Sequence, residues 1–284
     1  MQTVAQTRSS GRRSMVRHTF LMLAAFAMLY PLLWMLSASF RPQNEIFSTG
    51  SLIPSSVTLD SYVRGWNELQ VSFARFFSNS LVLSLTCVLG NLVACSITAF
   101  AFARLKFAGK SFWFALMLGT LMLPYQVTLI PQYVLFLHLG WVNTYLPLVV
   151  PKFLAVDSFF IFLMVQFFRG IPRELDEAAY MDGCSTFTIY WRIMLPLSLP
   201  VLTTAAIFTF IFTWDDFFGP LIYLNQMQNY TVTLALRSFV DSSAESDWGG
   251  LFAMSILSLV PIFLIFLFFQ RFLIEGIATT GMKR

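Results

Sequence analysis

Residues 76–103 read FFSNSLVLSLTCVLGNLVACSITAFAFA, a continuous apolar run without Asp, Glu, Lys or Arg. A helix rises about 1.5 Å per residue, so about 20 such residues cross the hydrocarbon core of a bilayer. Further long apolar runs lie at 19–40, 111–136, 145–168, 197–224 and 251–269. Lipid-exposed backbone must satisfy its own hydrogen bonds, and continuous runs favour helices over the alternating segments of a barrel. The sequence therefore predicts an all-α integral membrane protein with six transmembrane helices.

The composition is that of a chain surrounded by lipid. Of its 284 residues, 57% are hydrophobic and 11% are charged, whereas a soluble domain carries about 25% charged residues. So few charges cannot cover the surface of a water-soluble globule. The net charge of +4 then indicates anchoring in the membrane rather than nucleic-acid binding. Cys87, Cys95 and Cys184 form no CxxC or Cys/His pattern, so no metal site is predicted.

The first apolar run fits either a cleaved signal peptide or an uncleaved membrane span. Basic residues precede it, and Ser37-Ala38-Ser39 is compatible with a cleavage site. However, the apolar stretch from Thr19 to Phe40 is longer than the apolar core of a signal peptide, which has about 7–15 residues. We therefore expect it to remain as the first span.

The distribution of Lys and Arg predicts the orientation of the chain. With the N-terminus inside, thirteen basic residues fall on the inner side, four on the outer side, and Lys152 within a span. Cytoplasmic loops carry the excess of Lys and Arg, so both termini are expected in the cytoplasm. The inner residues are Arg8, Arg12, Arg13, Arg17, Arg104, Lys106, Lys110, Arg169, Arg173, Arg192, Arg271, Lys283 and Arg284. The outer residues are Arg41, Arg64, Arg75 and Arg237.

The inner segment 170–196 carries helix signals that the other loops lack. Glu174, Asp176 and Glu177 favour the N-terminus of a short helix, and Gly183 is a natural stop at its C-terminus. Two alanines on one face of this helix would allow another surface to approach closely. That face is predicted to carry Leu175, Ala178, Ala179 and Asp182.

A second short helix is expected directly after the first. Ser185 or Thr186 can cap it, and it should run to Leu195, where Pro196 follows. From these residues alone, the segment fits equally well a docking surface for a cytoplasmic protein or an amphipathic helix at the lipid interface.

The same segment resembles the cytoplasmic EAA loop of permease subunits from binding-protein-dependent ABC importers. The resemblance is carried by Glu177-Ala178-Ala179, by Asp182-Gly183 and by Ile193-Met194-Leu195-Pro196. We refer to residues 170–196 as the EAA loop. The match is specific, because the residue types, their spacing and the position between two spans all agree with the family pattern.

Two further segments resemble the carbohydrate-uptake branch of that family, of the maltose-transporter type. The first is Trp214-Asp-Asp-Phe-Phe-Gly-Pro-Leu221, and the second is the C-terminal stretch 270–283. Asp215 stands where the family usually has Asn, and the chain lacks the Ala and the final Gly of the usual ending. The resemblance extends over nearly the whole chain.

The resemblance implies a type I ABC importer permease fold with cytoplasmic EAA coupling helices, in a bacterial inner membrane. It implies import of a sugar or sugar-like solute that an extracytoplasmic solute-binding protein delivers. Such a permease pairs with a second permease subunit, usually as a heterodimer, and with two ATPase subunits. The chain itself is expected to be no enzyme and to bind no cofactor, since ATP and Mg²⁺ would be bound by the ATPase subunits.

The resemblance also implies which residues couple the chain to the ATPases. Glu177 would supply a polar contact, Ala178 and Ala179 close packing, and Gly183 the turn that aims the second helix. The implied coupling residues are Glu177, Ala178, Ala179, Asp182, Gly183, Ile193, Leu195 and Pro196.

These expectations divide the chain into a transmembrane permease domain and two cytoplasmic tails. The domain comprises residues 19–270, and the tails 1–18 and 271–284. Periplasmic loops are expected at 41–75 and 225–250. The acidic side chains of the second loop either meet a soluble partner or cap the helix bundle; they are Asp241, Glu245 and Asp247.

Polar side chains within spans usually face the interior of the bundle and mark candidate positions for the solute pathway. These candidates are Gln126, Thr128, Gln132, Asp157, Trp214, Asp215 and Asp216. Trp214 beside Asp215 offers a sugar both an aromatic face and a hydroxyl partner. The alternative is that these polar residues pair with the second permease subunit or shape the helix bend near Pro220. Lys152 and Asp157 are five residues apart and are not expected to pair.

Three other classes of membrane protein fit the sequence less well. A secondary transporter driven by an ion gradient should have an internal repeat and buried ionisable relays, and no clear repeat is present. A scaffold or receptor would not need the EAA loop. A membrane enzyme is not supported, because the sequence shows no recognisable arrangement of catalytic residues. Gly109-Lys110-Ser111 is no phosphate-binding loop, because Arg104 stands where the first glycine is required.

Overall fold

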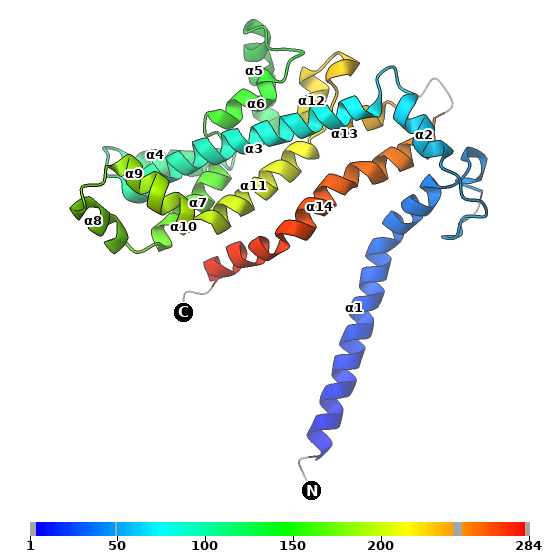
Figure 1. Cartoon of the computed structure of the whole chain (residues 1–284), viewed down its shortest axis with the longest axis horizontal. Coiled ribbons are helices and arrows are strands. Elements are labelled where there is room, and N and C mark those ends of the chain that lie inside the picture. Colours follow the sequence, from blue (N-terminus) through cyan, green and yellow to red (C-terminus); the bar gives the residue numbers. More distant parts are fainter. Residues whose placement is uncertain (1–3, 49, 241–245, 282–284) are drawn as a thin grey trace. The chain divides into compact units, whose positions relative to one another are not determined.

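The computed structural model describes residues 4–48, 50–240 and 246–281, with side chains described between residues 14 and 270 of these ranges. Every regular element in these ranges is helical (Figure 1). In chain order they are α1 (Val4–Ser39), η1 (Gln43–Glu45), α2 (Asp60–Asn67), α3 (Phe73–Arg104), α4 (Lys110–Thr120), α5 (Tyr125–His138), α6 (Leu146–Phe153), α7 (Ser158–Gly170), α8 (Glu174–Met181), α9 (Thr186–Ile189), η2 (Tyr190–Met194), α10 (Leu195–Leu197), α11 (Leu199–Trp214), α12 (Phe218–Tyr223), η3 (Met227–Asn229), α13 (Val232–Arg237) and α14 (Trp248–Gly281).

Among the described residues, four helical stretches are long and apolar enough to cross a membrane, and up to six if each of two bent helix pairs crosses it once. The expectation of six spans is therefore met when both bent pairs are counted. The single stretches are Ser14–Ser39, Phe73–Arg104, Leu146–Gly170 and Trp248–Gln270. The bent pairs are α4 with α5, at 99°, and α9–α10 with α11, at 77°.

Both bent pairs lie within predicted spans, the third and the fifth. The third predicted span breaks before α5 because Pro124 is extended, with ψ 133°, and has no N–H to continue a helix. The fifth predicted span, 197–224, is also not one helix, because α11 ends at Trp214 and α12 begins at Phe218. The fourth predicted span corresponds to the single stretch Leu146–Gly170, within which Ala155, with φ 55°, separates α6 from α7.

The chain divides into two compact units, and the division falls within α14. The first unit comprises Met1–Leu69 and Phe239–Leu257, and the second comprises Gln70–Ser238 and Ser258–Arg284.

In the first unit, the segment after α1 is held against the start of α14. The Gln43 side chain donates to the Ser246 carbonyl (2.9 Å) and accepts from the Gly249 N–H (3.0 Å). A Cβ added to Gly65 of α2 would lie 3.0 Å from the Cα of Gly250, so this close packing requires glycine.

In the second unit, α3 is the central helix and packs against α6, α7 and α11 (Figure 1). Its C-terminal half contributes Phe100 and Phe102 to the main apolar core, and α7 contributes Met164 and Phe168. Residues of the EAA loop complete this core, namely Ala179, Ile189, Tyr190 and Met194. The predicted functional loop is therefore built into the core of the unit rather than appended to it.

Candidate functional site

The first helix of the EAA loop ends as the sequence predicts. Gly183 has φ +80°, a conformation that a residue with a Cβ rarely adopts. The Gly183 N–H donates to the Tyr180 carbonyl (3.0 Å), and the Cys184 N–H donates to the Ala179 carbonyl (2.9 Å). This is a glycine-terminated helix end, and it fixes the direction of the chain towards α9.

The second helix of the EAA loop begins as expected but does not end as expected. Ser185 is its N-cap, and its Oγ accepts from the Thr188 N–H (3.2 Å). After Ile189 the chain winds into a π-helix, in which the Leu195 N–H donates to the Tyr190 carbonyl. Pro196, which lacks an N–H, is thereby accommodated within a helical stretch that continues to Leu197.

The two alanines of the motif do not share one exposed face. Ala178 is exposed beside the exposed Glu177, whereas Ala179 is 6% exposed and lies in the core. The expectation that both alanines face a docking partner was therefore wrong for Ala179. Successive residues of a helix are about 100° apart, so one of the pair can face outwards while the other packs inwards.

The exposed surface of the EAA loop is richer in large apolar side chains than the motif alone suggests. Met181 is 89% exposed and Phe187 is 69% exposed, and Tyr180 and Trp191 are also exposed. Singly exposed apolar residues need no explanation, but four of them within twelve residues, beside Glu177 and Ala178, form a surface suited to a protein partner. Sequence reasoning missed these four because they fall outside the motif.

Arg104, at the C-terminal end of α3, binds the base of the EAA loop. Its Nε lies 3.1 Å from Asp176 Oδ2 of α8, and one of its terminal nitrogens donates to the Ile171 carbonyl (2.7 Å). The side chains of Arg104 and Asp176 are 5% and 13% exposed. The sequence predicts Arg104 only as an inner-side charge, because nothing in the spacing relates residue 104 to residue 176.

The candidate residues for the solute pathway do not form one continuous group. Gln126 of α5 is exposed, and Thr128 and Gln132 are half-buried. Trp214 is 2% exposed, stacks on Phe210, and donates its indole N–H to the Ser258 carbonyl (3.1 Å). Its ring therefore serves packing within this unit, and Asp215 beside it is exposed.

Lys152 and Asp157 form an ion pair, with 2.8 Å between Nζ and Oδ2, so the expectation that they do not pair was wrong. The left-handed conformation of Ala155 turns the chain between α6 and α7 and brings the two side chains together. Lys152 and Asp216 line one small cavity of about 80 Å³. Asp216 also accepts from the Gly219 N–H (3.1 Å), which supports the alternative in which it shapes the bend near Pro220.

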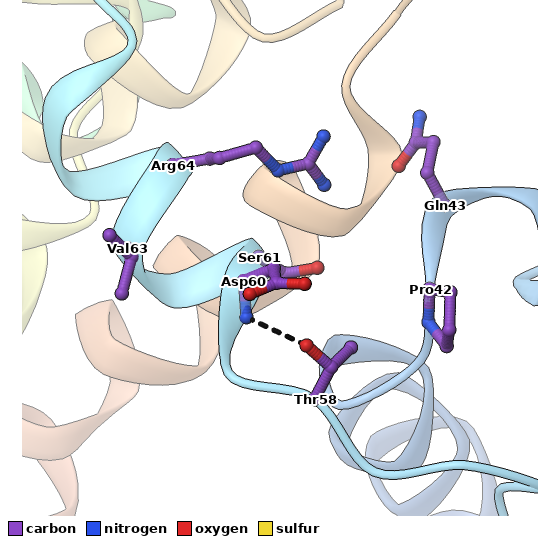
Figure 2. Close-up of a pocket in the computed structure, with 7 residues that line it drawn as sticks. All are labelled: Pro42, Gln43, Thr58, Asp60, Ser61, Val63 and Arg64. Carbon is purple, nitrogen blue, oxygen red and sulfur yellow. Dashed lines mark hydrogen bonds between the residues drawn. The ribbon is translucent and has the colours of Figure 1, made fainter.

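The first unit carries a recess of about 390 Å³ whose lining residues are drawn in Figure 2. These residues are Pro42, Gln43, Thr58, Asp60, Ser61, Val63 and Arg64. Of the acidic residues expected to meet a partner or cap the bundle, Asp241 and Glu245 lie outside the described residues. Asp247 is 8% exposed and lies 3.6 Å from the guanidinium of Arg64, so it acts within the unit.

Residues 89–278 match the model of a protein family described as "Binding-protein-dependent transport system inner membrane component". The chain belongs to this family. As a family member it is a multi-pass inner-membrane component of a transport system, and not an enzyme. The matched region includes the EAA loop and most of the second unit.

Curated relatives cover almost the whole length of this family member. It is 37% identical to "Probable ABC transporter permease protein YurM" of Bacillus subtilis, over 93% of this chain and 87% of that protein. It is 34% identical to "Arabinooligosaccharides transport system permease protein AraQ" of Halalkalibacterium halodurans, over 91% and 92% of the two chains. The fold matches a chain of a bacterial ABC transporter for the acidic polysaccharide alginate, with a TM-score of 0.83, 21% identity, and 93% and 97% coverage.

Proposed function

We propose that this chain is the permease subunit of an ABC importer for a sugar or sugar-like solute. The observation that carries the proposal is the exposed surface of the EAA loop at Glu177 and Ala178, held on a glycine-terminated helix whose other side lies in the core. A helix fixed in this way can pass a displacement of a docked protein to the membrane helices. The relative AraQ is named for the transport of arabinooligosaccharides, which supports an oligosaccharide as the solute class.

In the proposed assembly, a second permease subunit completes the membrane pathway and two ATPase subunits dock from the cytoplasm. A solute-binding protein delivers the solute on the outer side. ATP closes the ATPase pair, the docked EAA loops move together, and the spans alternate between inward-open and outward-open states. Both chain termini lie in the cytoplasm in this proposal, as the distribution of Lys and Arg favours.

Within the EAA loop, Glu177 and Ala178 supply the outward contacts, and Asp182 and Gly183 supply the turn. Ile193, Leu195 and Pro196 belong to the helical stretch that connects this surface to α11. ATP and Mg²⁺ are assigned to the partner ATPases. In this chain Lys110 donates to the Leu105 carbonyl (2.8 Å), so it serves to fold the loop after α3.

The proposal assigns the solute pathway to the polar groups near the cavity of Lys152 and Asp216. It adds Asp157, Asp215 and three polar side chains of α5, namely Gln126, Thr128 and Gln132. Charged side chains within spans are costly and usually face the bundle interior. Hydroxyl-rich solutes would find hydrogen-bond partners there. Trp214 is assigned a structural role and not a contact with the solute, because its side chain packs inside the unit.

The test is copurification of an ATPase with the chain, expressed with the products of its neighbouring genes and extracted in mild detergent. The unmodified chain should retain an ATPase, and Glu177→Lys should lose it while still inserting in the membrane. Glu174→Lys is the matched control, because Glu174 is also an exposed acid of α8 but lies outside the motif. If no nucleotide-binding protein associates with the unmodified chain, a gradient-driven transporter becomes the better hypothesis.

A further inference from the structure

Three residues of α3 face the EAA loop at intervals of four. Ser96 Oγ lies 2.8 Å from the Tyr190 hydroxyl, and the Phe100 ring packs 5.3 Å from the Tyr190 ring between centroids. One turn further, Arg104 pairs with Asp176 at 3.1 Å. Positions i, i+4 and i+8 lie on one face of a helix, so a single face of α3 holds both helical parts of the loop.

The Arg104 contact is the one that reaches α8 itself. Its guanidinium binds the Asp176 carboxylate and the Ile171 carbonyl at once, and a terminal nitrogen lies 3.9 Å from the Met194 sulfur. A planar guanidinium can hold several partners in fixed directions, which a lysine ammonium cannot. The ion pair is almost completely buried, and a buried charge is tolerated only with such partners.

Asp176 and Glu177 are neighbours with different roles in this arrangement. Asp176 points into the protein and is held by Arg104, whereas Glu177 is exposed. The orientation of the exposed surface is thus set by the side of α8 that faces inwards. A displacement applied at Glu177 reaches α3 through the neighbouring Asp176 and its ion pair, and through Ala179 in the shared core.

We propose that Arg104 is a positioning residue that fixes α8 to the end of α3, so that a displacement of α8 moves α3 with it. The inference rests on the proposed function, in which an ATPase docks on the exposed side of α8. The inference adds to that function that α3 is the first membrane helix to move when α8 is displaced. Arg104 makes no contact with the docked partner itself.

The experiment uses the complete transporter in lipid vesicles, with its second permease, ATPases and binding protein. The measured quantities are the ATPase retained and the solute taken up per ATP hydrolysed. Arg104→Gln should retain the ATPase but lower the uptake per ATP by about tenfold, within the range by which coupling residues act. Arg104→Lys should lower the uptake per ATP less than Arg104→Gln does. Lysine keeps the positive charge beside Asp176 but lacks the several N–H donors of the guanidinium.

Arg173→Gln is the matched control, since Arg173 is an exposed arginine directly before α8. It should leave the uptake per ATP unchanged. If Arg104→Gln also leaves it unchanged, the inference is overturned while the proposed function stands. If the unmodified chain binds no ATPase, the proposed function fails and the inference fails with it.

A second measurement covers the case in which Arg104→Gln does not accumulate in the membrane. Arg104→Cys and Asp176→Cys are combined in a Cys184→Ser chain and joined by a short reagent that links two thiols. The double variant lacks the ion pair, so its uptake per ATP should be low before linking. Linking should raise the uptake per ATP, because α3 and α8 are inferred to move as one body. Uptake per ATP that is intact before linking, or that linking does not raise, would overturn the inference.

Discussion

Ala178 and Ala179 are adjacent in α8 but face opposite environments, because Ala178 is exposed and Ala179 is only 6% exposed. The pair therefore separates the two tasks of the helix. One alanine leaves room for a docked partner, and the other leaves room for the core of its own unit.

Enlarging these two alanines should have different consequences. Ala179→Leu should lower the stability of the chain in detergent by about 1–3 kcal/mol, since it forces extra methyl groups into a packed core. Ala178→Leu should leave the thermal midpoint unchanged but remove the copurifying ATPase. Thermal unfolding and copurification on the same samples check both expectations. Equal loss of stability in both variants would contradict the assigned orientation of α8.

Replacing Gly183 by a residue with a side chain should strain the backbone and lower the stability of the chain. No atom lies within 4 Å of a Cβ added there, so the cost of Gly183→Ala comes from its φ of +80°. We expect about 1–2 kcal/mol of strain and a loss of uptake, because the turn between α8 and α9 must relax. Gly170→Ala is the control, since its added Cβ also meets nothing but its φ is not positive. The uptake rates and thermal midpoints of the two variants should therefore differ.

Breaking the Lys152–Asp157 ion pair should destabilise the junction of α6 and α7. Lys152→Met leaves a partly buried carboxylate without its cation, and we expect a loss of about 1–2 kcal/mol, below the value for a fully buried pair. The double variant with Asp157→Asn should recover most of this loss. Thermal unfolding of the two variants and the unmodified chain measures the difference. A double variant no more stable than Lys152→Met would argue against the pair.

The packing around Glu68 in the first unit should depend on pH. The pKa of Glu68 is raised above its ordinary value of 4.5, chiefly by the neighbouring Asp247 carboxyl and then by burial, while the charge of Arg64 opposes the rise. The folded chain then binds more protons than the unfolded chain between the two pKa values. This stabilisation is complete below pH 4.5 and is lost as the pH rises through the folded value.

Hydrogen exchange of α2 measures this dependence. Protection of α2 should fall as the pH is raised from about 4.5, after correction for the intrinsic exchange rate. Glu68→Gln cannot titrate at this position, and its protection should vary less over the same range. Parallel curves for the two chains would show that another group controls the packing of α2.

The sequence by itself determined the membrane class, the apolar helices and the location of the EAA loop. These features are local, since apolar runs, a glycine stop at Gly183 and a cap at Ser185 act over a few residues. The family resemblance likewise rested on a short motif with fixed spacing. Such signals can be read without knowing which helices meet.

Only the tertiary structure decided how these elements serve one another. The pairing of Arg104 with Asp176 joins residues 72 positions apart, and the burial of Ala179 depends on the core that α3 and α7 supply. The ion pair of Lys152 with Asp157 needed the left-handed turn at Ala155, which no local residue preference predicts. Trp214 likewise faces inwards because α14 offers it the Ser258 carbonyl, a partner fixed by packing rather than by sequence spacing.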